Sequence, residues 1–159
     1  MWAIVPIKTF ELAKQRLADV LSPNERKSLM LAMARDVLTT LAQTKLIKNI
    51  LIVSRAPEAD ALSQAFNTER FAENPAANLA QALEQAAHYL VDNFNAESIF
   101  IVPADVPGVD AEELNTLIKN HQSVTILPDS KKVGTNGLIC SPPLAIPYIF
   151  DGQSFKPHA

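Results

Sequence analysis

Residues 49–54 read Asn-Ile-Leu-Ile-Val-Ser, an apolar run of strand length between polar ends. Such a run without alternation is typical of a strand that is buried on both faces of a parallel sheet. Residues 2–7 and 98–102 have the same character. Shorter patterns predict further strands at residues 69–73, 123–127 and 138–140.

Helical patterns separate the predicted strands. Ser22-Pro23-Asn24-Glu25 indicates a helix start, because Ser22 can cap the first turn, Pro23 suits the first helical position and Glu25 completes a capping box. This helix is expected to extend to about residue 43. The apolar stripe along it is expected to hold Leu29, Met33, Val37 and Leu41. Further helices are expected at residues 57–66, 77–91 and 110–119.

Strands that alternate with helices predict βαβ units. We therefore expect one α/β domain over residues 1–159, with three αβα layers and a mostly parallel sheet. The length of 159 residues is enough for one such core and too short for two. Ligands of such sheets bind beyond the carboxyl ends of the strands, where the winding changes direction. This rule narrows the search to the loops around Lys8, Ser54, Asp105 and Pro128.

The composition argues against several classes of function. Lys and Arg number 14 against 17 Asp and Glu, and a net charge of −3 does not suit a broad nucleic-acid-binding surface. Cys140 is the only cysteine, which excludes an intramolecular disulfide, and it is expected in the core. No segment has the roughly 18 apolar residues of a membrane span, and residues 1–8 lack the pattern of a signal peptide. We expect a cytoplasmic protein that binds neither nucleic acid nor membrane, and a homodimer stays open.

Glycine is scarce, and its distribution excludes common phosphate-binding loops. None of the four glycines precedes residue 108, so neither a P-loop nor a dinucleotide-binding turn can follow the first strand. Side chains must then supply much of the contact to any anion there. Lys8, Lys14 and Arg16 suit a polyphosphate, since each charge-assisted hydrogen bond contributes roughly 1.5–3 kcal/mol. A solvated charged loop remains the alternative, because two acidic residues lie in the same segment.

Asp105 follows the apolar run at residues 98–102, within the sequence Pro-Ala-Asp-Val-Pro. A carboxylate at a strand end is well placed to hold Mg²⁺, whose usual ligands are one or two carboxylates, waters and substrate phosphates. The alternative is an aspartate that only caps a turn. The residues alone leave both interpretations open.

Two later segments offer polar groups. Residues 128–137 connect two predicted strands, where backbone amides and the Thr135 hydroxyl can face an anion, or where the chain simply forms a hairpin. Ser154 and His158 can bind a phosphate or belong to an exposed tail. The two remaining histidines, in or beside helices, are expected at the surface: His88 and His121.

Six short segments of this chain occur in an order that is itself informative. They are Val5-Pro6-Ile7-Lys8, Ala13-Lys14-Gln15-Arg16-Leu17, Leu21-Ser22-Pro23, Pro103-Ala104-Asp105-Val106-Pro107, Gly134-Thr135-Asn136 and Ser154-Phe155-x-x-His158. The ordered set resembles the 2-phospho-L-lactate or phosphoenolpyruvate guanylyltransferases of deazaflavin cofactor (coenzyme F-420) biosynthesis. The likeness spans nearly the whole chain.

The resemblance implies a nucleotidyltransferase fold of the GT-A type, related to the molybdenum cofactor guanylyltransferases. Members transfer GMP from GTP to a small phosphorylated acid, such as 2-phospho-L-lactate, phosphoenolpyruvate or 3-phosphoglycerate, and release pyrophosphate. The likeness places Lys8, Lys14 and Arg16 at the GTP phosphates. It makes Asp105 the ligand of Mg²⁺, and Asp105 and Lys14 the catalytic residues. The acceptor phosphate would be surrounded by Thr135, Asp151, Gly152 and Ser154.

The chain departs from the family pattern in three places. Asn78-Leu79-Ala80 stands where the family usually has Gly-Leu-Asn, so one polar nucleotide contact is missing at Ala80. Asp151 stands where many members have glycine. Family members continue for a few dozen residues beyond the segment that ends at His158, into an acidic stretch that resembles a second metal ligand. Residues 1–159 lack this stretch, so either the sequence is a truncated form or the protein lacks that ligand. Two alternatives stay open: a related nucleotidyltransferase with another nucleotide or acceptor, and a non-catalytic nucleotide-binding module.

Overall fold

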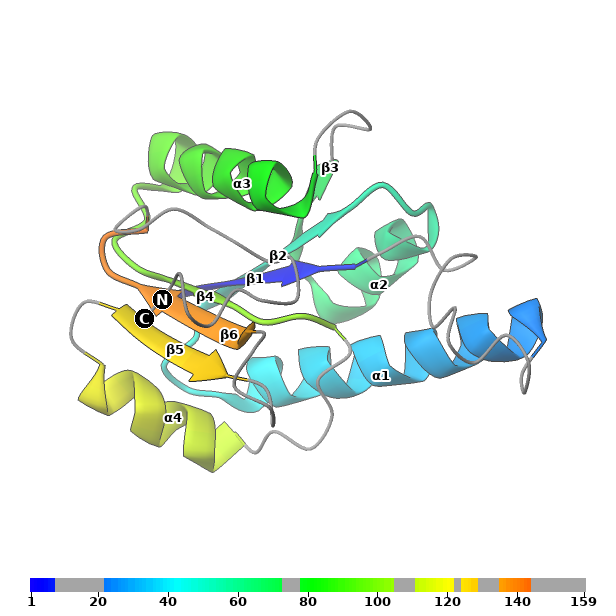
Figure 1. Ribbon diagram of the computed structural model, residues 1–159, viewed down its shortest axis with the longest axis horizontal. Coiled ribbons are helices and arrows are strands. Elements are labelled where there is room, and N and C mark those ends of the chain that lie inside the picture. Colours follow the sequence, from blue (N-terminus) through cyan, green and yellow to red (C-terminus); the bar gives the residue numbers. More distant parts are fainter. Residues whose placement is uncertain (8–21, 73–77, 105–110, 122–123, 129–134, 144–159) are drawn as a thin grey trace.

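A six-stranded sheet forms the centre of the molecule, and helices cover both of its faces. The computed structural model describes residues 1–7, 22–72, 78–104, 111–121, 124–128 and 135–143. The strand order across the sheet is β3-β2-β1-β4-β6-β5 (Figure 1). In chain order the strands are β1 (Trp2–Pro6), β2 (Asn49–Ser54), β3 (Glu69–Ala72), β4 (Ile99–Ile101), β5 (Val124–Pro128) and β6 (Thr135–Cys140).

The sheet is mostly parallel, as the continuous apolar runs predict. β1 pairs in parallel with β2 and β4, and β2 pairs in parallel with β3. Among the six described strands, only β6 is reversed: it is antiparallel to both β4 and β5. The chain winds outward from β1 through β2 to β3, and then returns to place β4 on the other side of β1. The winding therefore changes direction between β1 and β4.

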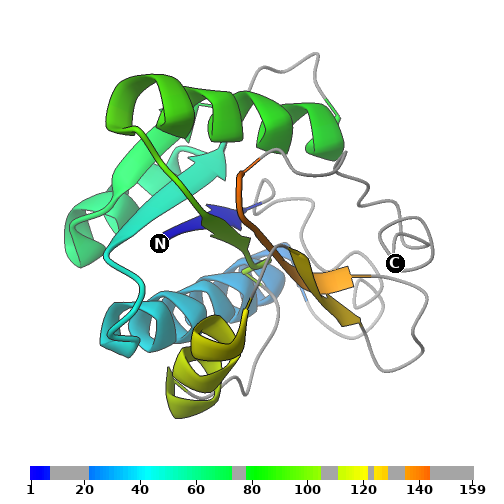
Figure 2. The ribbon, with the colours of Figure 1, turned by 90° about the vertical axis from the view of Figure 1, so that its left-hand side faces the viewer.

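The described part of the chain contains four helices: α1 (Pro23–Gln43), α2 (Glu58–Phe66), α3 (Leu79–Phe94) and α4 (Ala111–Asn120). α3 packs on one face of the sheet, whereas α1, α2 and α4 pack on the other (Figure 2). The three-layer αβα arrangement is thereby confirmed. None of these helices is long and apolar enough to cross a membrane.

α1 begins and ends where the sequence predicts. The Ser22 hydroxyl accepts a hydrogen bond from the Glu25 N–H at 3.2 Å, and the Glu25 carboxylate accepts one from the Ser22 N–H at 2.9 Å. This closed capping box gives partners to N–H groups that the first turn leaves without helical partners. The Ser22 backbone hydrogen bond also holds the pKa of Glu25 below its usual value.

The buried face of α1 differs from the expected stripe. Leu29 is 36% exposed and Met33 is only half-buried, whereas Met30 and Ala34 are buried. The other two expected positions are buried as predicted. The expectation followed the large apolar side chains, but the small side chain of Ala34 is the one that faces the sheet. The apolar stripe predicted from the sequence is therefore displaced by one residue from the observed buried face over the first half of α1.

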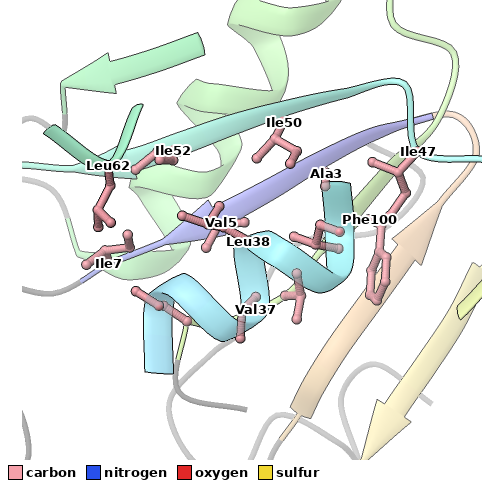
Figure 3. Close-up of a cluster of buried hydrophobic side chains, with 14 of the residues drawn as sticks. Ala3, Val5, Ile7, Val37, Leu38, Ile47, Ile50, Ile52, Leu62 and Phe100 are labelled. Atoms are coloured by element: carbon pink, nitrogen blue, oxygen red, sulfur yellow. The ribbon is translucent and has the colours of Figure 1, made fainter. Parts of the chain in front are cut away.

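Alternate residues of each central strand face the two helix layers. Val5 and Ile7 of the β1 segment face α1 and α2, where they lie in one cluster with Leu38 and Leu62 (Figure 3). Ile4, which directly precedes Val5 in the strand, packs on the α3 side. Burying each large aliphatic side chain contributes roughly 1.5–3 kcal/mol relative to leaving it exposed. Because both faces of the strands are covered, both must be apolar.

Candidate active site

The carboxyl ends of the parallel strands meet along one side of the sheet, which we call the ligand edge. Open α/β sheets bind ligands where the winding changes direction, and here this point lies between β1 and β4. Because β6 is reversed, its first residue also lies at this edge. That residue is Thr135, which pairs with Pro128 at the end of β5. The ligand edge thus brings together the ends of β1, β2, β4 and β5 and the start of β6.

Two buried residues fix the chain where it leaves the neighbouring strands β1 and β4. Ile7 is 2% exposed and Ala104 is 1% exposed. Each lies three residues beyond a residue of the last matched pair of the two strands, so they stand at nearly the same level. Ile7 directly precedes Lys8 in the sequence, and Ala104 directly precedes Asp105.

Most of the predicted site residues lie outside the described residues. They are the predicted nucleotide-binding residues, the predicted metal ligand and three of the predicted acceptor-binding residues: Lys8, Lys14, Arg16, Asp105, Asp151, Gly152 and Ser154. The backbone of Thr135 is described and opens β6. The roles predicted for all of these residues stay predictions.

The N-terminal parts of α1 and α2, which follow the ligand edge, are joined by an ion pair. Lys27 Nζ lies 2.9 Å from Glu58 Oε1. The hydrogen bond from Lys27 holds the pKa of the Glu58 carboxyl below its usual value. Arg26, on the same turn of α1 as Lys27, is buried with 7% exposure. Sequence reasoning did not single out these basic residues, although their place directly after a capping box was a usable signal.

Arg70 in β3 is hydrogen-bonded to the segment that follows β2. Its guanidinium donates to the carbonyl oxygens of Ser54, Ala56 and Phe71. The Ser54 hydroxyl accepts a hydrogen bond from the Ala56 N–H at 3.0 Å. Side chains from two strands thus hold the β2–α2 loop (residues 55–57). Sequence reasoning named the loop at Ser54 but missed Arg70, whose only local signal was a cation inside a short strand pattern.

α3 begins with a second capping box. The Asn78 side chain accepts a hydrogen bond from the Gln81 N–H at 2.8 Å, and the Gln81 side chain accepts one from the Asn78 N–H at 3.0 Å. The side-chain amide of Asn78, the first residue of the Asn78-Leu79-Ala80 segment, therefore caps the start of α3. Ala80 is half-buried against the α3-side core and has only a methyl group. That position offers no polar side chain to a ligand.

His121 and Cys140 lie away from the ligand edge. His121 Nδ1 is 2.8 Å from the Thr125 hydroxyl and Nε2 is 2.9 Å from the Ser141 hydroxyl, and burial lowers the pKa of the ring. The expectation of a simple surface residue is therefore wrong for His121, whereas His88 is exposed as predicted. Burial raises the pKa of the Cys140 thiol to about 11, so Cys140 is confirmed as a core residue.

Within the described ranges, no group of three or more His, Cys, Asp or Glu side chains is arranged to hold a metal ion. The predicted metal ligand, Asp105, lies outside these ranges, so the metal assignment stays a prediction.

The sequence matches the family described as "Guanylyl transferase CofC like" over residues 1–159. A phosphoenolpyruvate guanylyltransferase from Roseiflexus castenholzii is 35% identical over 158 residues, which cover 99% of this chain and 72% of that protein. A 2-phospho-L-lactate guanylyltransferase from Methanobrevibacter smithii is 32% identical, with coverages of 99% and 69%. A phosphoenolpyruvate guanylyltransferase from Thermobaculum terrenum is 30% identical, with coverages of 96% and 66%. The chain thus spans about two thirds of the length of the curated relatives it matches.

Solved structures of low sequence identity share the fold. A protein from Desulfovibrio desulfuricans described as a nucleotide-diphospho-sugar transferase superposes with a TM-score of 0.78 at 17% identity, over 99% of this chain and 72% of that chain. A nucleotidyl transferase from Methanothermobacter gives a TM-score of 0.66 at 16% identity, over 98% and 78% of the two chains. The nucleotidyltransferase fold expected from the sequence is confirmed.

Proposed function

The chain belongs to the family of CofC-like guanylyl transferases, and from this premise we propose that it transfers GMP from GTP to a small phosphorylated acid. Pyrophosphate is released, and the product serves deazaflavin cofactor biosynthesis. The observation that carries the proposal is the family match over residues 1–159, joined by guanylyltransferase relatives at 30–35% identity. A nucleotidyltransferase of other specificity and a non-catalytic module have no comparable support.

The reaction asks little covalent chemistry of the protein. A phosphate oxygen of the acceptor attacks the α-phosphorus of GTP, and a new P–O bond forms. The bond from the α-phosphorus to the oxygen shared with the β-phosphate breaks, and its electron pair leaves with pyrophosphate. The acceptor phosphate has a second pKa of about 6, so it is largely dianionic at neutral pH and needs no strong general base. Positioning and charge neutralisation supply most of the rate.

Repulsion between the two phosphate groups is the obstacle that the protein must offset. Two unit charges about 4 Å apart repel by roughly 4 kcal/mol at an effective dielectric constant near 20. In this proposal Lys8, Lys14 and Arg16 bind the GTP phosphates, and Lys14 acts as the catalytic cation. The buried position of Ile7 supports this assignment, because it fixes the chain at the ligand edge directly before Lys8.

Asp105 is the proposed protein ligand of Mg²⁺. Support comes from β4, which pairs with β1 and is followed three residues later by buried Ala104, directly before Asp105. Bound Mg²⁺ neutralises phosphate charge and stabilises the leaving pyrophosphate. Asp105 would hold this charge opposite the basic segment that follows β1.

The proposed acceptor site lies on the far side of β4 from β1. Thr135 opens β6, the strand next to β4, so nucleotide and acceptor would approach the ligand edge from opposite sides. The other proposed acceptor-binding residues are Asp151, Gly152 and Ser154. The Asp151 carboxylate would have to face away from the acceptor phosphate or meet the metal, because like charges repel.

An assay with a panel of substrates tests the proposal. The protein is incubated with Mg²⁺, with GTP, ATP or CTP, and with 2-phospho-L-lactate, phosphoenolpyruvate or 3-phosphoglycerate. Mass detection of the coupled product and release of pyrophosphate report turnover. We expect a guanylated product with GTP and one of these acids. Turnover with another nucleotide only, or GTP binding without pyrophosphate release from any acceptor, would replace this proposal with one of the two alternatives.

Substitution of Asp105 tests the metal assignment. Asp105→Asn removes the carboxylate charge at nearly constant size, so turnover should become undetectable while the circular dichroism spectrum stays unchanged. Asp92→Asn, at an exposed position of α3, is the matched control and should keep wild-type activity. Full activity of Asp105→Asn would remove Asp105 from the metal site.

We also propose a cytoplasmic enzyme with GTP and a phospho-acid as its partners, without nucleic-acid or membrane binding. Its substrates are small anions, and the net charge of −3 gives no general attraction to nucleic acid. A homodimer is compatible with this proposal. Light scattering of the purified protein distinguishes it from a monomer.

A further inference from the structure

We propose that Arg70 is a positioning residue for GTP, because its guanidinium holds the β2–α2 loop at the nucleotide side of the ligand edge. The inference rests on the proposed function and extends it. It concerns a residue that the predicted basic segment, Lys8 to Arg16, does not include. Arg70 acts through the loop and not by contact with the reacting atoms.

The contacts of Arg70 hold the loop to the edge strand. Arg70 Nη1 donates to the carbonyl oxygens of Ser54 and Phe71, and Nη2 donates to the Ala56 carbonyl at 3.3 Å. These carbonyls come from the last residue of β2, from the loop and from β3 itself. A planar guanidinium can reach several acceptors at fixed angles, which the single ammonium of a lysine cannot reproduce.

The ion pair between Arg70 and Asp60 adds little to this arrangement. Arg70 Nε lies 3.3 Å from Asp60 Oδ1, but this buried nitrogen lacks the alignment of a hydrogen bond. The Asp60 side chain is 69% exposed, where solvent weakens an ion pair. The position of the loop therefore depends on the carbonyl contacts, and the two contributions of Arg70 can be separated by mutation.

The loop held by Arg70 presents one charged side chain outward, that of Arg55. Ser54 and Ala56 are fully buried, whereas Arg55 between them is exposed. The hydrogen bond from the Ala56 N–H to the Ser54 hydroxyl tightens the same turn. Without the guanidinium, the carbonyls that anchor this turn would lose their charged partner. The backbone at the ligand edge, and Arg55 with it, would then move.

The loop lies on the nucleotide side of the proposed site. β2 is the neighbour of β1, whose end leads to Lys8, whereas Thr135 of the proposed acceptor site lies across β4. The far end of the loop leads to Glu58, which is joined to Lys27 of α1 at 2.9 Å. α1 in turn follows the basic segment in sequence. Displacement of the loop should therefore weaken GTP binding and leave acceptor binding unchanged.

Four variants separate the possible roles of Arg70. Arg70→Met removes the guanidinium but keeps the apolar stem, and Arg70→Lys keeps the charge without the planar group. Asp60→Asn removes only the ion pair. Arg35→Met, at an exposed position of α1, is the matched control for loss of an arginine. For each variant the Kd of Mg-GTP is measured by calorimetry, together with kcat, the KM of both substrates and the thermal midpoint.

Arg70→Met should raise the Kd and KM of GTP about tenfold, while the KM of the acceptor and kcat change less than about twofold, because a displaced loop mispositions only its own ligand. Arg70→Lys should recover part of the loss, and Asp60→Asn and Arg35→Met should resemble wild type. Equal rises in both KM values, or an unchanged Kd for GTP in folded Arg70→Met, would overturn the proposal. If Arg70→Met does not fold, the same comparison on Arg70→Lys decides.

Failure of this inference and failure of the proposed function give different results. If the wild-type protein binds GTP but turns over no acceptor, the proposed function fails while the Kd comparison still tests Arg70. If the wild-type protein turns over and the Arg70 variants keep the wild-type Kd for GTP, only the inference fails. A wild-type protein that does not bind GTP would remove both.

Discussion

At the scale of single residues, His121 joins three parts of the chain. His121 directly follows α4 in the sequence. Its two ring nitrogens form hydrogen bonds with the hydroxyl groups of Thr125 in β5 and Ser141, which follows β6. A neutral imidazole has one donor and one acceptor nitrogen, and each hydroxyl can take the complementary part. The half-buried ring is therefore suited to its neutral form, and protonation should weaken the fold.

The stability of the protein should reflect this histidine as the pH falls. Burial lowers the pKa of His121 in the folded state, so the unfolded chain binds the proton more readily. The contribution of neutral His121 is complete above the unfolded pKa of about 6.5 and is lost as the pH falls from there through the folded pKa. Urea unfolding between about pH 7.5 and about pH 5 should show a smaller loss in His121→Gln than in wild type.

The exposed histidine of α3 provides the control for this measurement. His88→Gln should follow the wild-type stability curve, because its side chain is exposed. A stability difference between wild type and His121→Gln that does not change with pH would contradict the role assigned to the ring.

Single-residue environments could be predicted where neighbours in sequence determine them. Cys140 ends an apolar run, and its burial was expected for that reason. Arg70 and His121 have partners 16 and 20 residues away, at Ser54 and Ser141, which only the folded topology brings close. Composition and spacing contain no sign of such contacts. The predicted phosphate-binding residues and the predicted metal ligand lie outside the described residues. Mutagenesis is needed to test their roles.

At the scale of elements, two leucines of α1 show which face of this helix packs against the sheet. Leu38 is fully buried between α1 and the sheet, whereas Leu29 of the same helix is 36% exposed. Leu38→Ala should reduce the free energy of unfolding by about 2–5 kcal/mol through lost burial and the cavity left behind. Leu29→Ala should change it by about 0.5 kcal/mol.

Urea unfolding of the two leucine variants measures these losses. The comparison is matched, because both substitutions remove the same atoms from the same helix. Similar losses for Leu29→Ala and Leu38→Ala would mean that the expected stripe, and not the observed one, describes the packed face.

The boundaries of β2 and the start of α1 were predictable because local chemistry sets them, whereas β6 begins three residues before the expected strand at 138–140. The expected strand at residues 49–54 coincides with β2, and the Ser22 capping box places the start of α1 correctly. The order of the strands was not predictable in the same way, since an apolar run has no preferred neighbour or direction. The reversal of β6 in particular leaves no mark in its composition.

At the scale of the whole molecule, ligand binding should stabilise the folded state. Mg-GTP at about 100 times its Kd adds about 2.7 kcal/mol by mass action. For a chain of this size the thermal midpoint should rise by about 5–10 °C. Differential scanning fluorimetry measures the shift, and removal of Mg²⁺ with EDTA should reduce it. A shift that is equal with and without Mg²⁺ would contradict a metal bridge between the protein and the phosphates.

The order of the strands in the sheet also affects how the protein folds while the ribosome synthesises it. β5 touches the sheet only through β6, although β6 is made later. Until residues 135–140 have emerged, a nascent β5 has no strand to join, and the outer side of β4 stays open to chaperones or to other chains. A stop codon between residues 129 and 134 would therefore cost the sheet two strands, β5 and β6, rather than one.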